Sequence, residues 1–212
     1  MSDRNIRVRG SAKVTAAPDW IIINFDVESR QYSYAECMAL LNQKTEHLRA
    51  ELQKVGLDKD SLKTTQFNID TNFEWIKDKR VFQGYKATHD LTVEFPFNKM
   101  YLNQVLNVLG HTESEASFRI LFIVKDPEPL RQQALAEAVK NCRQKAEVLA
   151  EAAGVKLGEL QHIDYSWSEL HFEHKMYVCE SNVPLERSAP AYDIEPDDVN
   201  ISDSVTVIWA IK

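Results

Sequence analysis

A change of hydrophobic period between residues 20 and 56 constrains the fold more than any other feature of this sequence. From Trp20 to Arg30 apolar and polar side chains alternate, which is typical of a strand with one buried face. From Ser33 to Val55 apolar residues recur at three- and four-residue spacing, and Gly56 follows where a helix C-cap belongs. The sequence therefore predicts a strand followed directly by a long amphipathic helix.

The remaining elements follow from the same two periods. Strands are predicted at 6–14, 62–75, 81–95, 116–124, 159–167 and 199–211, and helices at 99–109 and 127–153. A long loop before the last strand has room for one short strand at 175–178, which is not counted in the order below. The order β-β-α-β-β-α-β-α-β-β predicts an α+β fold, with a mostly antiparallel sheet and helices packed on one face, in a single domain of residues 1–212. The tight link at Ala17-Pro18-Asp19 predicts a hairpin between the first two strands.

The alanine-rich helix at 127–153 has its own signature. Asp126-Pro127-Glu128 is a favourable helix start, and Gly154 ends the helix. The predicted buried stripe consists of Leu135, Ala138, Cys142, Ala146, Leu149 and Ala153. Small residues on such a stripe predict a close approach of this helix to a sheet or to another helix.

Residues 169–198 differ in character from the rest. The segment contains three prolines and eight acidic residues, with Lys175 and Arg187 as its strong bases. A connection of this length is uncommon in a compact domain and predicts a functional or mobile loop or arm. Its apolar anchors are interface candidates for a homo-oligomer: Phe172, Tyr177, Val183, Leu185 and Tyr192. The alternative is a loop that is disordered or docks on its own domain.

Charge and hydropathy exclude several classes. The formal net charge of −7 and the lack of a dense basic cluster argue against nucleic-acid binding. No apolar run reaches membrane-span or signal-peptide length, so we expect a chain without a membrane span that is cytoplasmic as given, or periplasmic if the chain is a processed form. Three cysteines cannot all pair within the chain and suit a reducing compartment.

The sequence gives only weak support for a site that uses a metal or a reactive thiol. His171 and His174 lie three residues apart, with His162 and Cys179 nearby in sequence, but zinc needs three or four ligands at fixed geometry. We therefore expect no cofactor and no stoichiometric zinc, and keep a metal- or thiol-dependent enzyme using His162, His171, His174 and Cys179 as the alternative function. Cys37 near a helix start could be reactive, although its apolar neighbours favour a structural role.

Other candidates have structural explanations. The acids Asp19, Asp26 and Glu28 fit a turn and a polar strand face, and His89 and Asp90 fit a strand, so no general acid–base pair is predicted. Aromatic residues gather near turns and in the arm: Phe73, Trp75, Phe82, Tyr85, Trp167, Phe172, Tyr177 and Tyr192. Core packing explains most of them, and subunit interfaces use the same residue types.

Several short motifs follow one another along the chain. They are Ile6-Arg-Val-Arg-Gly10-Ser-Ala-Lys-Val14, Ala17-Pro18-Asp19, Gly56 with Leu62-Lys-Thr-Thr-Gln-Phe-Asn-Ile69, Gly84-Tyr85-Lys-Ala87 and the helix end Lys145-Ala146-Glu-Val-Leu149-Ala150-Glu-Ala-Ala-Gly154-Val-Lys-Leu157-Gly158. In this order and at these separations they resemble the SIMPL-domain family over residues 5–212. The resemblance implies an α+β fold, ring-like or channel-like oligomers and a loose association with oxidative-stress protection, without a defined reaction or catalytic residues. Pro196-Asp197-Asp198 departs from the family, in which glycine usually follows the proline.

Together these features favour a self-assembling, non-enzymatic protein that acts through protein–protein surfaces.

Overall fold

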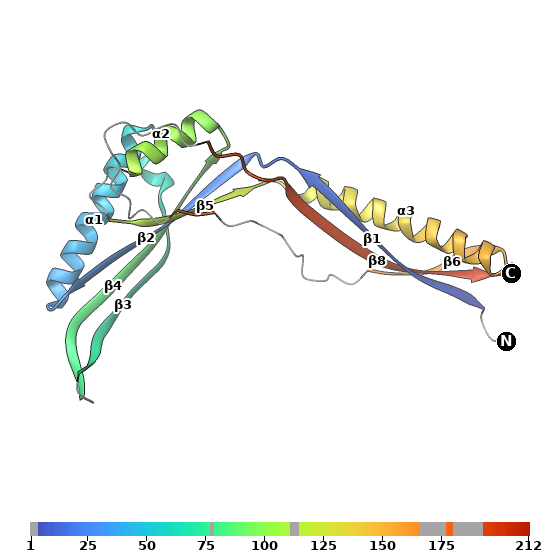
Figure 1. Cartoon of the computed structure of the whole chain (residues 1–212), viewed down its shortest axis with the longest axis horizontal. Helices are drawn as coiled ribbons and strands as arrows, with labels where there is room; N and C mark the ends of the chain where they lie inside the picture. Colours follow the sequence, from blue (N-terminus) through green and yellow to red (C-terminus); the bar gives the residue numbers. More distant parts are fainter. Residues whose placement is uncertain (1–3, 77–78, 111–114, 166–176, 180–192) are drawn as a thin grey trace. The chain divides into compact units, whose positions relative to one another are not determined.

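The computed structural model describes residues 4–76, 79–110, 115–165, 177–179 and 193–212 (Figure 1). Its elements run in the order β1 (Asn5–Ala16), β2 (Trp20–Gln31), α1 (Tyr34–Lys54), the short 3₁₀ helix η1 (Lys59–Ser61), β3 (Lys63–Ile76), β4 (Lys79–Pro96), α2 (Lys99–Leu109), β5 (Ser117–Ile123), α3 (Glu128–Ala152), β6 (Leu157–Asp164), β7 (Tyr177–Cys179) and β8 (Val199–Ile211). The predicted α+β class and the predicted order of strands and helices are confirmed. No helix among the described residues is long and apolar enough to cross a membrane.

The chain forms two compact units. Unit 1 comprises Met1–Pro18, Val124–His174 and Asp197–Lys212, and unit 2 comprises Asp19–Ile123 and Lys175–Pro196. Each unit has its own antiparallel sheet and its own buried apolar cluster. The single domain predicted for residues 1–212 requires that the two units unfold together, and this stays a prediction.

Unit 1 consists of the sheet β1-β8-β6 with α3 packed against it. The buried residues of α3 are all small: Ala134, Ala138, Cys142, Ala146 and Ala150. They bring the helix so close to the sheet that a Cβ atom on Gly10 of β1 would lie 2.2 Å from the carbonyl oxygen of Ala138. The close approach predicted for this helix is confirmed. Leu149 and Ala153 were wrongly placed on the buried stripe, because the contact runs along Ala134, Ala138, Cys142, Ala146 and Ala150. It leaves Leu149 51% exposed, and Ala153 is exposed as well.

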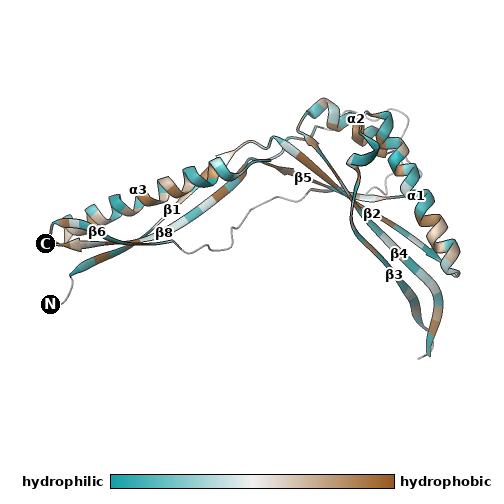
Figure 2. Ribbon diagram, turned by 180° about the vertical axis from the view of Figure 1, so that it is seen from behind, coloured by the Kyte–Doolittle hydropathy of each residue, from teal (hydrophilic) through white to brown (hydrophobic). Residues whose placement is uncertain are grey.

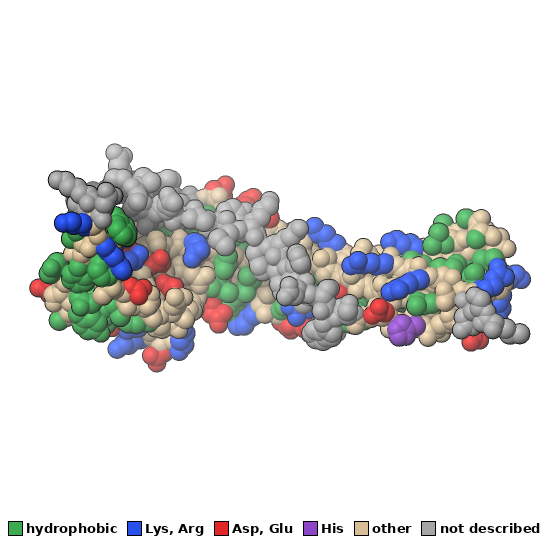
Figure 3. All heavy atoms as spheres, turned by 90° about the horizontal axis from the view of Figure 1, so that it is seen from below, with side chains coloured by type: hydrophobic (Ala, Val, Ile, Leu, Met, Phe, Trp, Pro, Cys, Tyr) green, Lys and Arg blue, Asp and Glu red, His purple; other side chains and the backbone are tan. Residues whose placement is uncertain are grey.

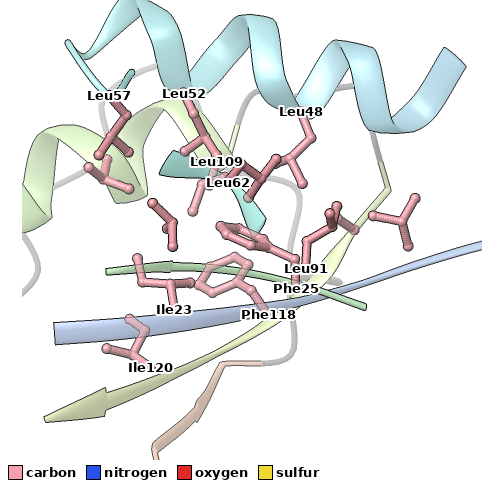
Figure 4. Close-up of a cluster of buried hydrophobic side chains, with 14 of the residues drawn as sticks. Ile23, Phe25, Leu48, Leu52, Leu57, Leu62, Leu91, Leu109, Phe118 and Ile120 are labelled. Atoms are coloured by element: carbon pink, nitrogen blue, oxygen red, sulfur yellow. The ribbon is translucent and has the colours of Figure 1, made fainter. Parts of the chain in front are cut away.

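Unit 2 consists of the five-stranded sheet β3-β4-β2-β5-β7 with α1 and α2 contributing to one core. Alternate residues of β2, among them Ile23 and Phe25, meet leucines of α1 and side chains of β4 and β5 in this core (Figure 4). Hydrophobic and hydrophilic segments alternate along α1 and α3, as expected for helices with one buried face (Figure 2). Thr45 interrupts the apolar stripe of α1, and its hydroxyl bonds Nδ1 of His89 at 3.2 Å.

The predicted hairpin between the first two strands is wrong. β1 pairs with β8 along its whole length, whereas β2 pairs with β4 and β5 in the other sheet. The linking residue Asp19 already bonds within unit 2, since its N–H donates to Ile123 O at 3.1 Å and its carbonyl accepts from Phe97 N at 2.8 Å. A three-residue link thus joins two sheets here, and link length alone does not reveal this.

Candidate functional site

The β3–β4 hairpin is longer than the strand beside it. β4 pairs with β2 only from Tyr85 to Pro96, while its pairing with β3 continues to Lys79. Residues 72–76 and 79–84 therefore lie beyond the end of β2 (Figure 1). This end of the hairpin has no neighbouring strand on the β2 side within the described residues.

A β-bulge arranges the aromatic residues of this hairpin on one face. The β3–β4 register shifts between Asn72 and Phe73, which leaves Gln83 without a partner and places Phe82 and Tyr85 on the same side. Their rings lie 5.6 Å apart in an edge-to-face arrangement. Gly84 permits the bulge, because its φ is +102° and a Cβ atom would lie 2.3 Å from the carbonyl oxygen of Gln31.

The aromatic rings form a continuous row. Phe73 contacts Phe82 with ring centroids 5.7 Å apart, and Tyr85 contacts Tyr34 of α1 at 5.6 Å. Tyr32 packs on Phe82 at 5.4 Å. The guanidinium carbon of Arg80 lies 3.8 Å from the centroid of the Phe73 ring, which is a cation–π contact.

Much of this row is open to solvent. Tyr32 is 71% exposed and Tyr34 is also exposed. Trp75 lies two residues after Phe73 on the same face of β3, opposite Arg80, and is 74% exposed. Viewed from the side of the hairpin end, hydrophobic side chains gather at the surface of unit 2 (Figure 3). We call Tyr32, Tyr34, Phe73, Trp75, Phe82 and Tyr85, together with Arg80, the aromatic surface. Exposed Trp, Tyr and Arg are the residues that contribute most to protein–protein binding energy.

Sequence reasoning found part of this surface. It named Phe73, Trp75, Phe82 and Tyr85 as aromatics near turns, and the structure brings these four to one place. It missed Tyr32, and it counted Tyr34 only among the apolar residues that predict the helix at 33–55. The sequence did contain a signal for these two residues, namely the run Tyr32-Ser33-Tyr34 at the junction between a strand and a helix. Both tyrosines are exposed at this junction.

Most residues of the predicted arm and metal set lie outside the described residues. These are Trp167, His171, Phe172, His174, Val183, Leu185 and Tyr192. Tyr177 and Cys179 bound the short strand β7, which pairs with β5. His162 lies exposed on β6. The described ranges contain no group of three or more His, Cys, Asp or Glu side chains that could hold a metal ion, and the arm and metal predictions stay predictions.

The thiols of Cys37 and Cys142 occupy structural positions. Cys37 is fully buried, with its Sγ 3.3 Å from the hydroxyl of Ser29. Cys142 is fully buried between α3 and the sheet of unit 1, where its Sγ lies 3.3 Å from Val205 O. Burial raises the pKa of the Cys142 thiol, which disfavours the reactive thiolate.

His89 also has a structural environment. Its Nε2 bonds the hydroxyl of Thr64 at 2.8 Å, while its Nδ1 bonds Thr45. Burial, followed by the nearby charge of Arg49, lowers the pKa of His89, so the neutral ring is favoured. A ring with both nitrogens engaged by hydroxyl groups is held in place and has no free nitrogen for a metal or a substrate.

Two carboxylates oppose each other on the solvent face of the sheet in unit 2. Asp26 of β2 is directly opposite Asp90 of β4. Burial, then the charges of Asp90 and Glu28, raise the pKa of Asp26. Glu28 behaves differently: burial opposes its ionisation, but hydrogen bonds from Lys86 and Arg30 lower its pKa overall.

Replacing Asp26 by asparagine is expected to stabilise the protein at neutral pH. The folded pKa of Asp26 is above its ordinary value of 3.8, so ionised Asp26 destabilises the fold once pH exceeds the folded pKa. The gain should be about 0.2–1 kcal/mol, the range of cross-strand charge pairs, and should disappear as pH falls below the unfolded pKa. Urea unfolding at about pH 3 and pH 7 measures it, with Asp60→Asn as an exposed control. If Asp26→Asn and the wild type are equally stable at about pH 7, the repulsion between Asp26 and the neighbouring carboxylates is contradicted.

Proteins from bacteria and from mouse resemble the chain. The uncharacterised protein YggE of Edwardsiella ictaluri (strain 93-146) is 24% identical over 205 residues, which are 96% of this chain and 85% of that protein. The 26 kDa periplasmic immunogenic protein of Brucella melitensis is 28% identical over 169 residues, 74% of this chain and 65% of that protein. The interleukin-1 receptor-associated kinase 1-binding protein 1 of Mus musculus is 25% identical over 159 residues, 74% of this chain and 58% of that protein.

The chain thus spans less than two thirds of the Brucella and mouse relatives, and none of these three proteins carries the name of an enzyme. Two relatives, from Brucella melitensis and Brucella abortus, are named as periplasmic, so the expectation of a cytoplasmic chain gains no support from them. The SIMPL family, described as a protein of unknown function (DUF541), matches residues 6–209. With nearly its whole length matched, this chain belongs to the SIMPL family.

Proposed function

We propose that this chain is a non-enzymatic protein that assembles with further copies of itself and acts through protein–protein surfaces. The aromatic surface carries the proposal. Large aromatic side chains are ordinarily covered, and here several converge on one face while Trp75 and Tyr32 stay exposed. A neighbouring copy that covers them would remove this apolar area from water, at roughly 25 cal/mol per Å².

The charge at the aromatic surface also favours a protein partner. Arg80 stacks on Phe73 and so combines an apolar plane with hydrogen-bond donors. The relatives add support of a coarser kind: the mouse protein is named as a kinase-binding protein, and the Brucella protein as periplasmic. We extend both to this chain as a proposal, namely binding to protein and a periplasmic location. A role in oxidative-stress protection rests on the family resemblance.

The segment 169–198 contributes to its own unit where it is described. β7 extends the sheet beside β5, and Ile194 packs against the core of unit 2. Lys99 Nζ lies 2.6 Å from Asp193 Oδ1 and 3.5 Å from Glu195 Oε1. These contacts fit a self-docked segment, so in the proposal the aromatic surface replaces the arm as the main contact between copies.

The solution mass of the purified chain tests the proposal. We expect light scattering to give a mass above that of one chain, and the variant Trp75→Ser/Tyr32→Ser to dissociate at a protein concentration at least about tenfold higher than the wild type. Loss of two interface aromatics removes 2 kcal/mol or more, and 1.4 kcal/mol is a factor of ten.

Met100→Ser is the matched control. Met100 is 76% exposed on α2 in the same unit, so the substitution removes a comparable exposed apolar side chain away from the aromatic surface. A monomeric wild type at all accessible concentrations would overturn self-assembly. If the control and the double variant have equal effects, self-assembly is supported, but the aromatic surface is not the contact between copies. A chain lacking residues 180–192, measured in the same way, tests the contribution of the arm.

A further inference from the structure

Beside the aromatic surface, the edge strand β3 has backbone groups for which the described residues provide no partner strand. It is 14 residues long and pairs with β4 alone in the described part of the chain. An exposed strand edge of this length is a ready template for pairing with another strand, which natural proteins usually block.

The register shows which residues of β3 point outward. Phe97 N donates to Asp19 O, and the same register continues along β2 and β4, so odd-numbered residues of β4 bond toward β2. Pro96, which has no N–H, occupies an even position that this pattern leaves unbonded to β2. From Gly84 onward, even-numbered residues of β4 therefore bond toward β3, where Lys86 is opposite Asp70, so even-numbered residues of β3 bond toward β4. The extra residue of the bulge, Gln83, belongs to β4, so the alternation along β3 continues unchanged to Trp75. It follows that Phe67, Ile69, Thr71, Phe73 and Trp75 direct their N–H and C=O groups away from the sheet.

The other long edge strand, β1, is protected. Asn141 Nδ2 donates to Ser11 O at 2.9 Å, and Lys145 Nζ donates to Arg9 O at 3.2 Å, so side chains of α3 occupy two carbonyl groups of the edge. β1 also carries Arg7, Arg9 and Lys13, and charged residues discourage edge pairing. From Thr64 to Trp75, β3 contains no lysine, arginine or proline. Of these two edges, β3 is the one that the described residues leave open to another strand.

We infer that β3 pairs antiparallel with β3 of a second copy about a two-fold axis through Thr71. The inference rests on the proposed self-assembly and specifies its contact. Each Thr71 would be opposite the partner subunit's Thr71. Ile69 would be opposite the partner subunit's Phe73, and Phe67 would be opposite the partner subunit's Trp75. Phe67 and Trp75 are both exposed, and cross-strand aromatic pairs stabilise antiparallel sheets.

The acidic side chains of β3 favour an axis at Thr71 over an axis one residue to either side. An axis through Asp70 would place Asp70 opposite the partner subunit's Asp70. An axis through Asn72 would place Asp70 opposite the partner subunit's Glu74. Like charges directly opposite each other are destabilising. With the axis at Thr71, Asp70 is opposite the partner subunit's Asn72, and Glu74 is opposite the partner subunit's Asn68. Both acids of β3 then meet amides, and the contact is self-complementary, as a two-fold interface requires.

Cysteine cross-linking tests the register. In the wild-type background, Thr71→Cys should form a disulfide-linked dimer under mild oxidation, because directly hydrogen-bonded antiparallel residues have Cα atoms about 5.5 Å apart, within the range of disulfides. Asn72→Cys is the control, since its Cα atom would be about 8 Å from the partner subunit's Asn72, too far for a disulfide. The wild type shows what the native cysteines contribute.

Thr71→Lys tests the contact without cross-linking. The side chain of Thr71 is exposed, so the substitution leaves the fold of one chain intact, which thermal unfolding checks. It places two lysines opposite each other at the axis and should raise the dissociation constant at least about tenfold. Thr15→Lys, on the exposed edge of β1, is the matched control and should have no effect.

The outcomes separate the two proposals. A wild type that is monomeric overturns self-assembly and this contact together. A wild type that assembles, with no dimer from Thr71→Cys and an unchanged mass for Thr71→Lys, overturns the β3 contact and leaves self-assembly standing. A dimer from Asn72→Cys that equals that from Thr71→Cys overturns the register.

Discussion

Replacing Gly10 by alanine is expected to lower the free energy of unfolding of unit 1 by about 3 kcal/mol, the upper part of the range for overpacking a core. The added Cβ atom would lie 2.2 Å from Ala138 O, 2.6 Å from Cys142 Sγ and 2.8 Å from Cys142 N. Two of these three atoms belong to the backbone of α3, so the whole helix must move away from the sheet. Urea unfolding measures the change, followed by fluorescence in a background in which Trp20, Trp75 and Trp167 are replaced by phenylalanine. The remaining Trp209 is buried in unit 1 and is then the reporter.

Two further variants sharpen this test. Ser11→Ala changes the neighbouring exposed residue and should stay within about 0.5 kcal/mol of the wild type, as surface substitutions do. Adding Cys142→Ala to Gly10→Ala should not restore stability, because the shortest contact is with the carbonyl of Ala138. A loss below about 1 kcal/mol for Gly10→Ala would show that α3 does not pack against β1 as closely as described.

Local sequence patterns predicted the elements of this fold but not the partners of its strands. The helix predicted at 33–55 is α1 at Tyr34–Lys54, because apolar spacing and a glycine stop are encoded within that segment. The pairing of β1 with β8 joins residues about 195 positions apart, and no local pattern encodes it. The chain leaves one sheet after Ala16 and enters the other at Trp20, so the short link that predicted a hairpin connects two different sheets.

The aromatic surface was half predictable for a similar reason. Composition near the hairpin turn identified Phe73, Trp75, Phe82 and Tyr85. Their convergence depends on the bulge at Gln83, which moves Tyr85 to the face of Phe82, and on the end of β2, which brings Tyr32 beside it. A strict period of two would have separated Phe82 from Tyr85. The bulge is a property of two paired strands, and the glycine at 84 was its one sequence signal.

Replacing Phe25 by alanine is expected to lower the free energy of unfolding of unit 2 by about 3–5 kcal/mol, the range for large-to-small changes in cores. Phe25 is 1% exposed at the centre of the core, where it is opposite both Leu91 and Phe118 (Figure 4). Its ring lies 6.2 Å from that of Phe118, so the substitution also removes an aromatic pair. Phe25→Leu, which keeps most of the volume, should cost about 1.5 kcal/mol or less.

Phe25→Ala also tests whether residues 1–212 unfold as one domain. Trp209 reports on unit 1, while Phe25 lies in unit 2, so the two sites belong to different apolar clusters. If unfolding is cooperative over the whole chain, Phe25→Ala should shift the Trp209 transition as far as the transition seen by circular dichroism. A Trp209 transition that stays at its wild-type midpoint, with a second transition at lower urea, would show two domains that unfold independently. A loss below about 1 kcal/mol would instead contradict the central place of Phe25 in the core of unit 2.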